Sequence, residues 1–186
     1  MTIIQSLQKK LRNHDLDGFL IMSPINRRYV TGFTGTAGAV LFTESDAQFI
    51  TDFRYVEQAE EQVHGFQIVK QAGSLMNEIA DQVRSLGIKK LGFEKTKLTY
   101  AEYEQLEQTL TGTTLVAINQ MVEPLRLIKT PEEIQTMKKA ADIAEKAYAH
   151  IQTFIKPGVK EIDVSNELEF FMRKQGAVSS SFDIIV

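Results

Sequence analysis

The stretch 17-DGFLIMSPINRRYVTGFTGTAGAVLFTESDAQFITDFRYVEQAEEQ-62 decides the fold, because apolar runs alternate in it with turn-forming and polar segments. "FLIMS" (19–23) is a short, mostly apolar run that is typical of a buried strand. "AGAVLFT" (37–43) and "QFITD" (48–52) flank the polar "ESDA", which predicts a β-hairpin. A polar helix is expected to follow, from about Phe53 to Gln62.

Helical and strand patterns keep alternating on both sides of this stretch. Ile3 or Ile4, Leu7 and Leu11 recur at helical spacing and predict an opening amphipathic helix. Helices are also expected from Ser74 to Gly87, with Leu75, Ile79, Val83 and Leu86 on one face, and from 100 to 110, where Thr99 and Glu102 have capping-box spacing. Further strands are expected at 66–70, 88–94 and 113–119. Residues 1–123 therefore predict one α/β domain with a roughly six-stranded mixed sheet flanked by helices.

Residues 124–186 have a different pattern, which begins with a long helix. Thr130 is the expected N-cap, Pro131 follows at the first helical position, and Glu133 completes a capping box. The helix is expected to stop at 156–158, where Pro follows Lys and precedes Gly. Apolar residues step by three and four along it, and this heptad stripe consists of Ile134, Met137, Ala141, Ala144, Tyr148, Ile151 and Ile155. It covers only about three heptads, so it favours a helix that faces a core over a coiled coil.

The remaining elements do not complete a second core. A helix is expected over about 160–175, with Val164, Leu168, Phe171 and Met172 on one face and with Lys160 as a weak start. The apolar run 182–186 predicts a buried strand, but no partner strand is visible, and unpaired buried backbone groups are costly. Residues 124–186 are therefore expected to be a linker helix and the first part of an incomplete domain, whose missing strands would pair with 182–186.

Composition limits the possible function classes. Over 186 residues the net charge is −3 and no basic stripe is visible, so nothing points to nucleic-acid binding. The chain has no cysteine, which excludes disulfides, thiol nucleophiles and cysteine metal sites. The N-terminus has no signal-peptide pattern, and the apolar runs are too short to span a bilayer. These features predict a cytoplasmic protein without a membrane partner.

Catalytic residue sets are not visible in the sequence. The three histidines, His14, His64 and His150, are far apart and form no metal-binding pair. The glutamates are explained by solvated helix faces and caps, and Ser179–Ser181 are interpreted as a turn. The glycines of "TGFTGTAG" (31–38) match neither phosphate-binding motif, and a flexible connection is preferred over a phosphate site.

The most suggestive local segment is "TDFRY" (51–55), where a strand is expected to end and a helix to begin. Arg54 and Tyr55 can present a guanidinium fork and a phenol to a partner or ligand at this corner. The alternative is that Asp52 caps the helix while Arg54 is an ordinary surface residue.

Several of these stretches, in this order, resemble one family. Residues 17–43 and 49–62 resemble the N-terminal domain of the creatinase, prolidase and aminopeptidase P group. Residues 123–148, 154–176 and 181–186 resemble the linker and the opening of that group's catalytic domain, and the nearest likeness is to bacterial Xaa-Pro aminopeptidases or dipeptidases. The chain departs from the family at Lys160, where a capping residue is usual, and at Ile184, where threonine is frequent.

The resemblance implies a pita-bread catalytic domain that binds two divalent metals (Mn, Co or Zn) through two aspartates, a histidine and two glutamates. A bridging hydroxide would attack the peptide bond before proline. The resemblance places all five ligands beyond the segment that 181–186 matches. It therefore assigns no catalytic or metal-binding residue to this chain, which is expected to bind no cofactor and to be inactive alone.

The resemblance also implies that the N-terminal domain packs on another copy of the chain and narrows the mouth of its active site. Tyr29, Arg54 and Tyr55 are the candidates for that contact. Two alternatives stay open: a stand-alone dimerisation or binding module, in which a second copy completes residues 159–186, and part of a creatinase-type amidinohydrolase.

Overall fold

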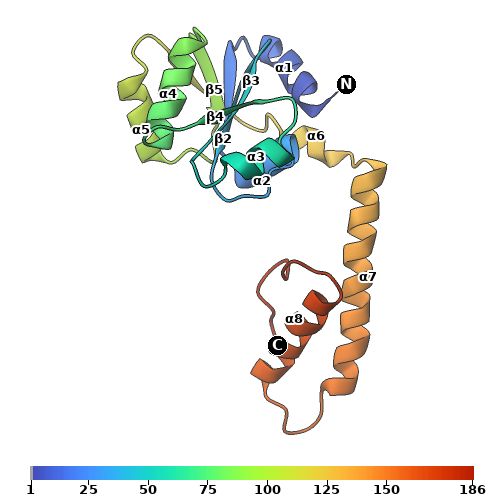
Figure 1. The fold of residues 1–186 in the computed structure, drawn as a ribbon. Coiled ribbons are helices and arrows are strands. Elements are labelled where there is room, and N and C mark those ends of the chain that lie inside the picture. Colours follow the sequence, from blue (N-terminus) through green and yellow to red (C-terminus); the bar gives the residue numbers. More distant parts are fainter. Residues whose placement is uncertain (1) are drawn as a thin grey trace. The chain divides into compact units, whose positions relative to one another are not determined.

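A computed structural model describes residues 2–186 and divides the chain into two compact units (Figure 1). The first unit extends to Leu127, and the second is Ile128–Val186. The sequence predicted a boundary at 123/124, four residues earlier. No helix within residues 2–186 is long and apolar enough to cross a membrane.

The first unit is built on one six-stranded sheet with the order β4-β3-β2-β1-β5-β6. The strands are β1 (Gly18–Ile21), β2 (Ala39–Thr43), β3 (Ala47–Thr51), β4 (Gln67–Lys70), β5 (Lys90–Glu94) and β6 (Thr114–Ile118). β2 runs antiparallel to both β1 and β3, while the β1–β5, β5–β6 and β3–β4 pairs are parallel. The predicted mixed sheet is therefore confirmed. Five strands end at the same edge, and only β2 begins there.

Helices cover both faces of this sheet. They are α1 (Ile3–Asn13), α2 (Pro24–Thr31), α3 (Val56–Gln62), α4 (Leu75–Ser85), α5 (Tyr100–Thr109) and α6 (Glu123–Leu127). Leu7 and Leu11 of α1 pack against one face, in the same cluster as Phe19 and Phe42. Ile79 and the rest of the apolar face of α4 pack against the other, as Figure 1 shows for α4 and α5. Because side chains alternate along a strand, consecutive residues such as Phe19 and Leu20 supply different cores.

The sequence missed α2 and α6, and it placed the start of α3 too early. Ser23 caps α2 through its side chain, Pro24 occupies the first turn, and Gly32 ends the helix in the left-handed conformation with φ 77°. Helix α3 begins at Val56, because Asp52–Tyr55 forms a turn instead of the predicted first helical turn.

The second unit contains α7 (Pro131–Phe154) and α8 (Glu161–Lys174), both at the predicted positions. The capping box of Thr130 and Glu133 is present, whereas Lys160 makes no side-chain cap, as its weak N-cap propensity predicted.

Most of the heptad stripe of α7 is exposed within residues 2–186, so the part of the catalytic domain in this chain does not bury it. Ile134, Met137, Tyr148 and Ile155 are exposed, and Ile151 is the one buried member of the stripe. The reason is that only the C-terminal half of α7 meets α8, where Ala147 and Ile151 are buried with Val164. Residues 182–186 form no strand, and Phe182 and Ile185 are exposed.

Candidate functional site

The candidate site is the edge of the sheet where β1, β3 and β5 end and where the loop 32–38 enters β2. The carboxyl ends of parallel strands are where ligands bind in open α/β sheets. Here this edge carries an unusual concentration of buried polar side chains, which include Ser23, Asn26, Arg27 and Glu94.

Glu94 at the end of β5 is the centre of the first polar cluster and is only 6% exposed. Its Oε2 accepts hydrogen bonds from the backbone N–H of Met22 (2.7 Å) and Ser23 (2.6 Å). Its Oε1 accepts one from Asn26 Nδ2 at 2.6 Å. These bonds place a carboxylate at the start of α2, where it complements the positive end of the helix.

Asn26 joins this cluster to α6. Its Nδ2 also donates to Glu123 Oε1 at 2.8 Å, and its Oδ1 accepts from Arg126 Nη1 at 3.1 Å. Burial acts to raise the pKa of Glu123, but the Asn26 amide, the N–H groups of residues 122 and 123 and the Arg126 charge together lower it. The amide therefore connects two carboxylates that belong to different elements.

Arg27 is 3% exposed, and its guanidinium holds the glycine-rich loop 32–38 through hydrogen bonds. Its Nη1 donates to the carbonyl of Gly38 (2.5 Å), and its Nη2 donates to those of Gly35 and Thr36 (both 3.0 Å). Burial lowers the pKa of Arg27. The loop is thus tied down, which differs from the flexible connection that its glycines suggested.

Of the three predicted contact residues, Arg54 and Tyr55 lie together on this edge. Arg54 donates from Nε and Nη2 to the two carboxylate oxygens of Asp52, at 3.0 and 2.8 Å. The guanidinium lies 5.4 Å from the centre of the Tyr55 ring. The hydrogen bond from Arg54 lowers the pKa of Asp52, which favours the ionised carboxylate in this pair.

The Tyr55 side chain connects this corner to the loop above Arg27. Its hydroxyl lies 2.7 Å from Thr36 Oγ1, and its ring meets the ring of Phe33 edge-on at 5.8 Å. Phe53, in the same turn, is 74% exposed. The sequence reasoning named Arg54 and Tyr55 but missed Phe53, although an apolar residue inside a polar turn was a readable signal.

Tyr29 has a different environment from the other two candidates. It is half-buried on α2, and its hydroxyl donates to the carbonyl of Leu125 at 2.8 Å. This bond ties α2 to α6, so Tyr29 has an internal packing role in this unit. Its part in an intersubunit contact stays a prediction.

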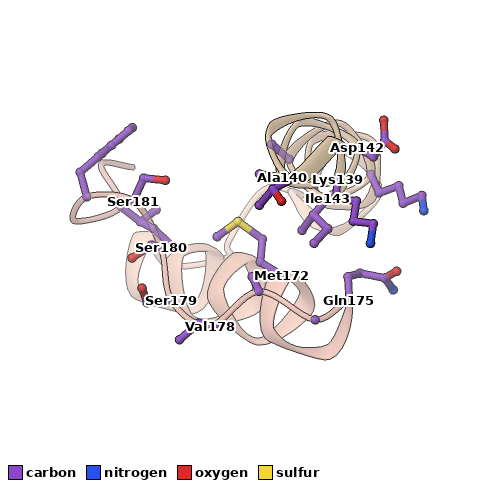
Figure 2. Close-up of a pocket in the computed structure, with 17 residues that line it drawn as sticks. Lys139, Ala140, Asp142, Ile143, Met172, Gln175, Val178, Ser179, Ser180 and Ser181 are labelled. Atoms are coloured by element: carbon purple, nitrogen blue, oxygen red, sulfur yellow. The ribbon is translucent and has the colours of Figure 1, made fainter. Parts of the chain in front are cut away.

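A groove of about 770 Å³ lies within the second unit (Figure 2). Its walls come from α7, from the end of α8 and from residues 175–184. Ala140, Ile143 and Met172 give it an apolar floor, and Ser179–Ser181 line its other side in Figure 2. Elsewhere in this unit, His150 of α7 lies 2.6 Å from Glu167 of α8 and stacks on Phe171.

The Creatinase/Prolidase N-terminal domain family matches residues 3–128. The chain belongs to this family. Metallopeptidase family M24 matches residues 135–186, so the chain covers the N-terminal domain and part of the catalytic domain of such peptidases. The predicted creatinase/prolidase resemblance is confirmed.

Individual relatives agree with this assignment. An uncharacterized peptidase of Bacillus subtilis is 53% identical over 182 residues, which are 96% of this chain and 52% of that protein. The structure of an Xaa-Pro dipeptidase from Bacillus anthracis is 52% identical with a TM-score of 0.93, and the match covers 97% of this chain and 51% of that one. The N-terminal domain of the cytoplasmic peptidase PepQ from Mycobacterium tuberculosis is 33% identical, with a TM-score of 0.62 over 67% of this chain and 98% of that one.

The chain spans about half the length of the curated relatives it matches. M24 peptidases generally use divalent metals, but residues 2–186 contain no group of three or more His, Cys, Asp or Glu that could hold a metal ion. Hard cations need several convergent oxygen ligands, and structural or catalytic zinc needs at least three protein ligands. The side chains described here therefore do not fit the family's metal centre, and no metal-dependent step is assigned to them.

Proposed function

We propose that this chain is the N-terminal portion of a proline-specific peptidase that cleaves Xaa-Pro bonds with two divalent metals (Mn, Co or Zn) in the cytoplasm. The observation that carries the proposal is the order of the two family matches, residues 3–128 and then 135–186, on one continuous chain. The relatives named Xaa-Pro dipeptidase support the substrate class. The metal ligands belong to the part of such enzymes that these residues do not match, so residues 1–186 alone are inactive.

The N-terminal domain then serves subunit association and shapes the mouth of a neighbouring subunit's active site. The corner at Arg54 and Tyr55 supports this role, because both side chains are held in place by partners in their own domain. Arg54 is exposed and Tyr55 half-buried, and arginine and tyrosine are enriched among the residues that dominate the binding energy of protein interfaces. A surface fixed before contact loses less conformational entropy on binding than a mobile one does.

A chimeric enzyme tests the proposal. Residues 1–186 are fused to the part of the Bacillus anthracis Xaa-Pro dipeptidase that lies beyond its match to this chain. We expect manganese-dependent hydrolysis of an Xaa-Pro dipeptide by the chimera, and none by the 186-residue chain or by the added part alone. A folded but inactive chimera, or hydrolysis by the 186-residue chain, contradicts the proposal.

Variants of the chimera test the contact residues. Arg54→Ala and Tyr55→Phe should raise KM more than they lower kcat, because they change the mouth and not the chemistry. Arg12→Ala is the matched control, since Arg12 also makes a two-bond ion pair, with Glu44, at the hairpin on the opposite edge of the sheet. An equal effect of Arg12→Ala would contradict the role of the Arg54 corner.

A second candidate, a stand-alone dimerisation module, is favoured by the exposed apolar residues of the second unit. Ile134, Met137, Ile162 and Phe170 are all exposed there, and contiguous apolar surface is characteristic of interfaces. Light scattering combined with hydrogen exchange over residues 125–186 separates the two candidates. A dimer with this segment protected supports the module, and a monomer with fast exchange supports the peptidase portion.

A further inference from the structure

The glycine-rich loop has an electrostatic feature that the proposed function does not use. Arg27 is a buried cation, and no carboxylate within residues 2–186 forms an ion pair with it. Its Nε has no hydrogen-bond partner within residues 2–186. A buried charge without a counter-ion is costly, and it favours an anion near it.

The three carbonyls that Arg27 holds determine where the loop's N–H groups point. In a trans peptide the C=O and the N–H of the next residue point in opposite directions, and no cis peptide is found within residues 2–186. The carbonyls of Gly35 and Thr36 point at Arg27. The N–H groups of Thr36 and Ala37 therefore point away from it, and the described chain provides no acceptor for either.

Hydroxyl groups add further donors at the same place. Thr36 is exposed, and its hydroxyl lies 2.7 Å from that of Tyr55. One of these hydroxyls donates to the other, so one hydroxyl hydrogen of the pair remains for a third group. Two backbone N–H groups and this hydroxyl are donors without an acceptor in the described chain, and the charge of Arg27 lies behind them, which is the kind of arrangement that favours an anion.

The Asp52–Arg54 pair does not cancel this charge. Both carboxylate oxygens of Asp52 are engaged by Arg54, so the pair is internally neutral. Glu94 and Glu123 are bound by the Asn26 amide and not by Arg27. The loop thus lies on a buried cation that no carboxylate of residues 2–186 pairs with, in a chain whose net charge is −3.

We propose that the loop 35–38 binds a carboxylate, that of a peptide C-terminus, through the N–H groups of Thr36 and Ala37 and the hydroxyl pair of Thr36 and Tyr55, with Arg27 as the positioning residue and buried counter-charge. The choice of a peptide carboxylate over other anions rests on the proposed peptidase function. The binding itself concerns only residues of this chain. A single carboxylate held by a few hydrogen bonds is expected to bind with a Kd of roughly millimolar.

The test is a nuclear magnetic resonance titration of the ¹⁵N-labelled 186-residue chain. Glycyl-proline is the ligand, glycyl-prolinamide is the matched control without the carboxylate, and inorganic phosphate is the control for a general anion. We expect glycyl-proline to shift the amide signals of Thr36 and Ala37 in a saturable way, and the amide form to leave them unchanged. Equal shifts with the amide form, no shifts at all, or tighter binding of phosphate would each overturn the proposal.

Two variants distinguish the specific position of the Arg27 side chain from a general effect of net charge. Arg27→Met should weaken glycyl-proline binding by about tenfold or more, because it removes both the charge and the three carbonyl contacts. Arg28→Met is the matched control, since Arg28 is the next residue of α2 and is exposed. Equal losses for the two variants would show that net charge alone acts, which contradicts the proposal.

Three other variants keep the proposal testable if Arg27→Met fails to fold. Tyr55→Phe and Thr36→Val remove the hydroxyl donors at the surface and should each weaken binding several-fold. Gly35→Ala changes no charge, but its added Cβ would clash with the rings of Phe33 and Tyr55, so the loop or these rings must shift and binding should be weakened. Unchanged binding in all three variants would place the carboxylate elsewhere.

The chimera and the titration can fail independently. An inactive chimera together with shifted Thr36 and Ala37 signals would reject the peptidase proposal and keep the anion site. An active chimera with unchanged Thr36 and Ala37 signals would keep the peptidase proposal and reject the anion site.

Discussion

The two units of the chain use apolar residues in opposite ways. In the first unit, the apolar faces of the helices and both faces of the sheet are covered, so residues such as Phe42 and Ile79 have no exposed surface. In the second unit, α7 and α8 bury Ala147, Ile151 and Val164, while larger side chains such as Met137, Tyr148 and Phe170 remain exposed. A similar amphipathic pattern therefore yields a closed core in one unit and an open face in the other.

This difference shows that the local features that start a helix are not the interactions that stabilise a domain. Helix α7 has a complete capping box and a proline in its first turn, and these local features specify where it begins. These capping features bury almost no apolar surface, and the burial of apolar surface is the dominant favourable contribution to folding. The first unit should therefore carry most of the stability of the chain.

The largest expected effect is in the core of the first unit. Phe42→Ala removes a fully buried ring that lies 5.8 Å from the ring of Phe19, and it should lower the free energy of unfolding by about 3–5 kcal/mol. Tyr148→Ala, at an exposed position of α7, should change it by less than about 0.5 kcal/mol. Urea unfolding followed by circular dichroism measures both, and similar losses would show that the second unit has a core of comparable importance.

The next largest effect concerns the polar cluster at the sheet edge. Glu94→Gln keeps the shape of the side chain but sets an NH₂ group against donors, since Glu94 accepts from two backbone N–H groups and from Asn26. We expect a loss of about 2–3 kcal/mol, because a buried donor is left unsatisfied. Glu104→Gln, at an exposed position of α5, should be neutral. Equal stability of the two variants would mean that the cluster adds nothing to the first unit.

The sequence predicted those parts of the fold that depend on local periodicity. All six strands, the hairpin between β2 and β3 and the long helix α7 were found this way. Helix α2 was missed because it has only eight residues, although Ser23 and Pro24 are recognisable start signals. Periodicity also showed which residues of α7 share a face, but not whether anything covers that face.

The candidate site could be predicted from local periodicity only in small part. Glu94 and Asn26 are 68 positions apart, and no spacing rule relates them, since the sheet order alone brings β5 beside β1. The burial of Arg27 was equally invisible, because arginine is normally exposed. Arg54 and Tyr55 could be named as candidates because their turn lies directly after a recognisable strand, and their role stays a prediction.

A smaller effect is expected at the start of α7 in the second unit. Thr130→Ala removes the side chain that accepts the backbone N–H of Glu133, at a cost of about 1 kcal/mol to the helix. Because little apolar packing supports this end of α7, the loss should appear as faster hydrogen exchange in residues 131–136. Thr99→Ala removes an equivalent capping box from α5, where Leu106 is buried. The faster hydrogen exchange should then appear across the whole first unit, through global unfolding, and not only at the start of α5. The same exchange pattern in both variants would contradict the difference between the units.

The smallest effect is a dependence on pH at the end of the first unit. The folded state lowers the pKa of Glu123, so the ionised carboxylate stabilises the fold above the ordinary glutamate pKa of about 4.3, and this contribution is lost as pH falls through the lower folded pKa. Glu123→Gln should therefore flatten the loss of unfolding free energy below about pH 4.3 relative to the wild type. Hydrogen exchange at low pH should locate the change at α6, where Asn26 binds Glu123, and leave α7 unaffected. Because Glu123 begins the last helix of the closed unit, an identical acid dependence in Glu123→Gln would show that the Glu123 carboxylate does not hold this helix and that its contacts with Tyr29 and Asn26 through Leu125 and Arg126 suffice.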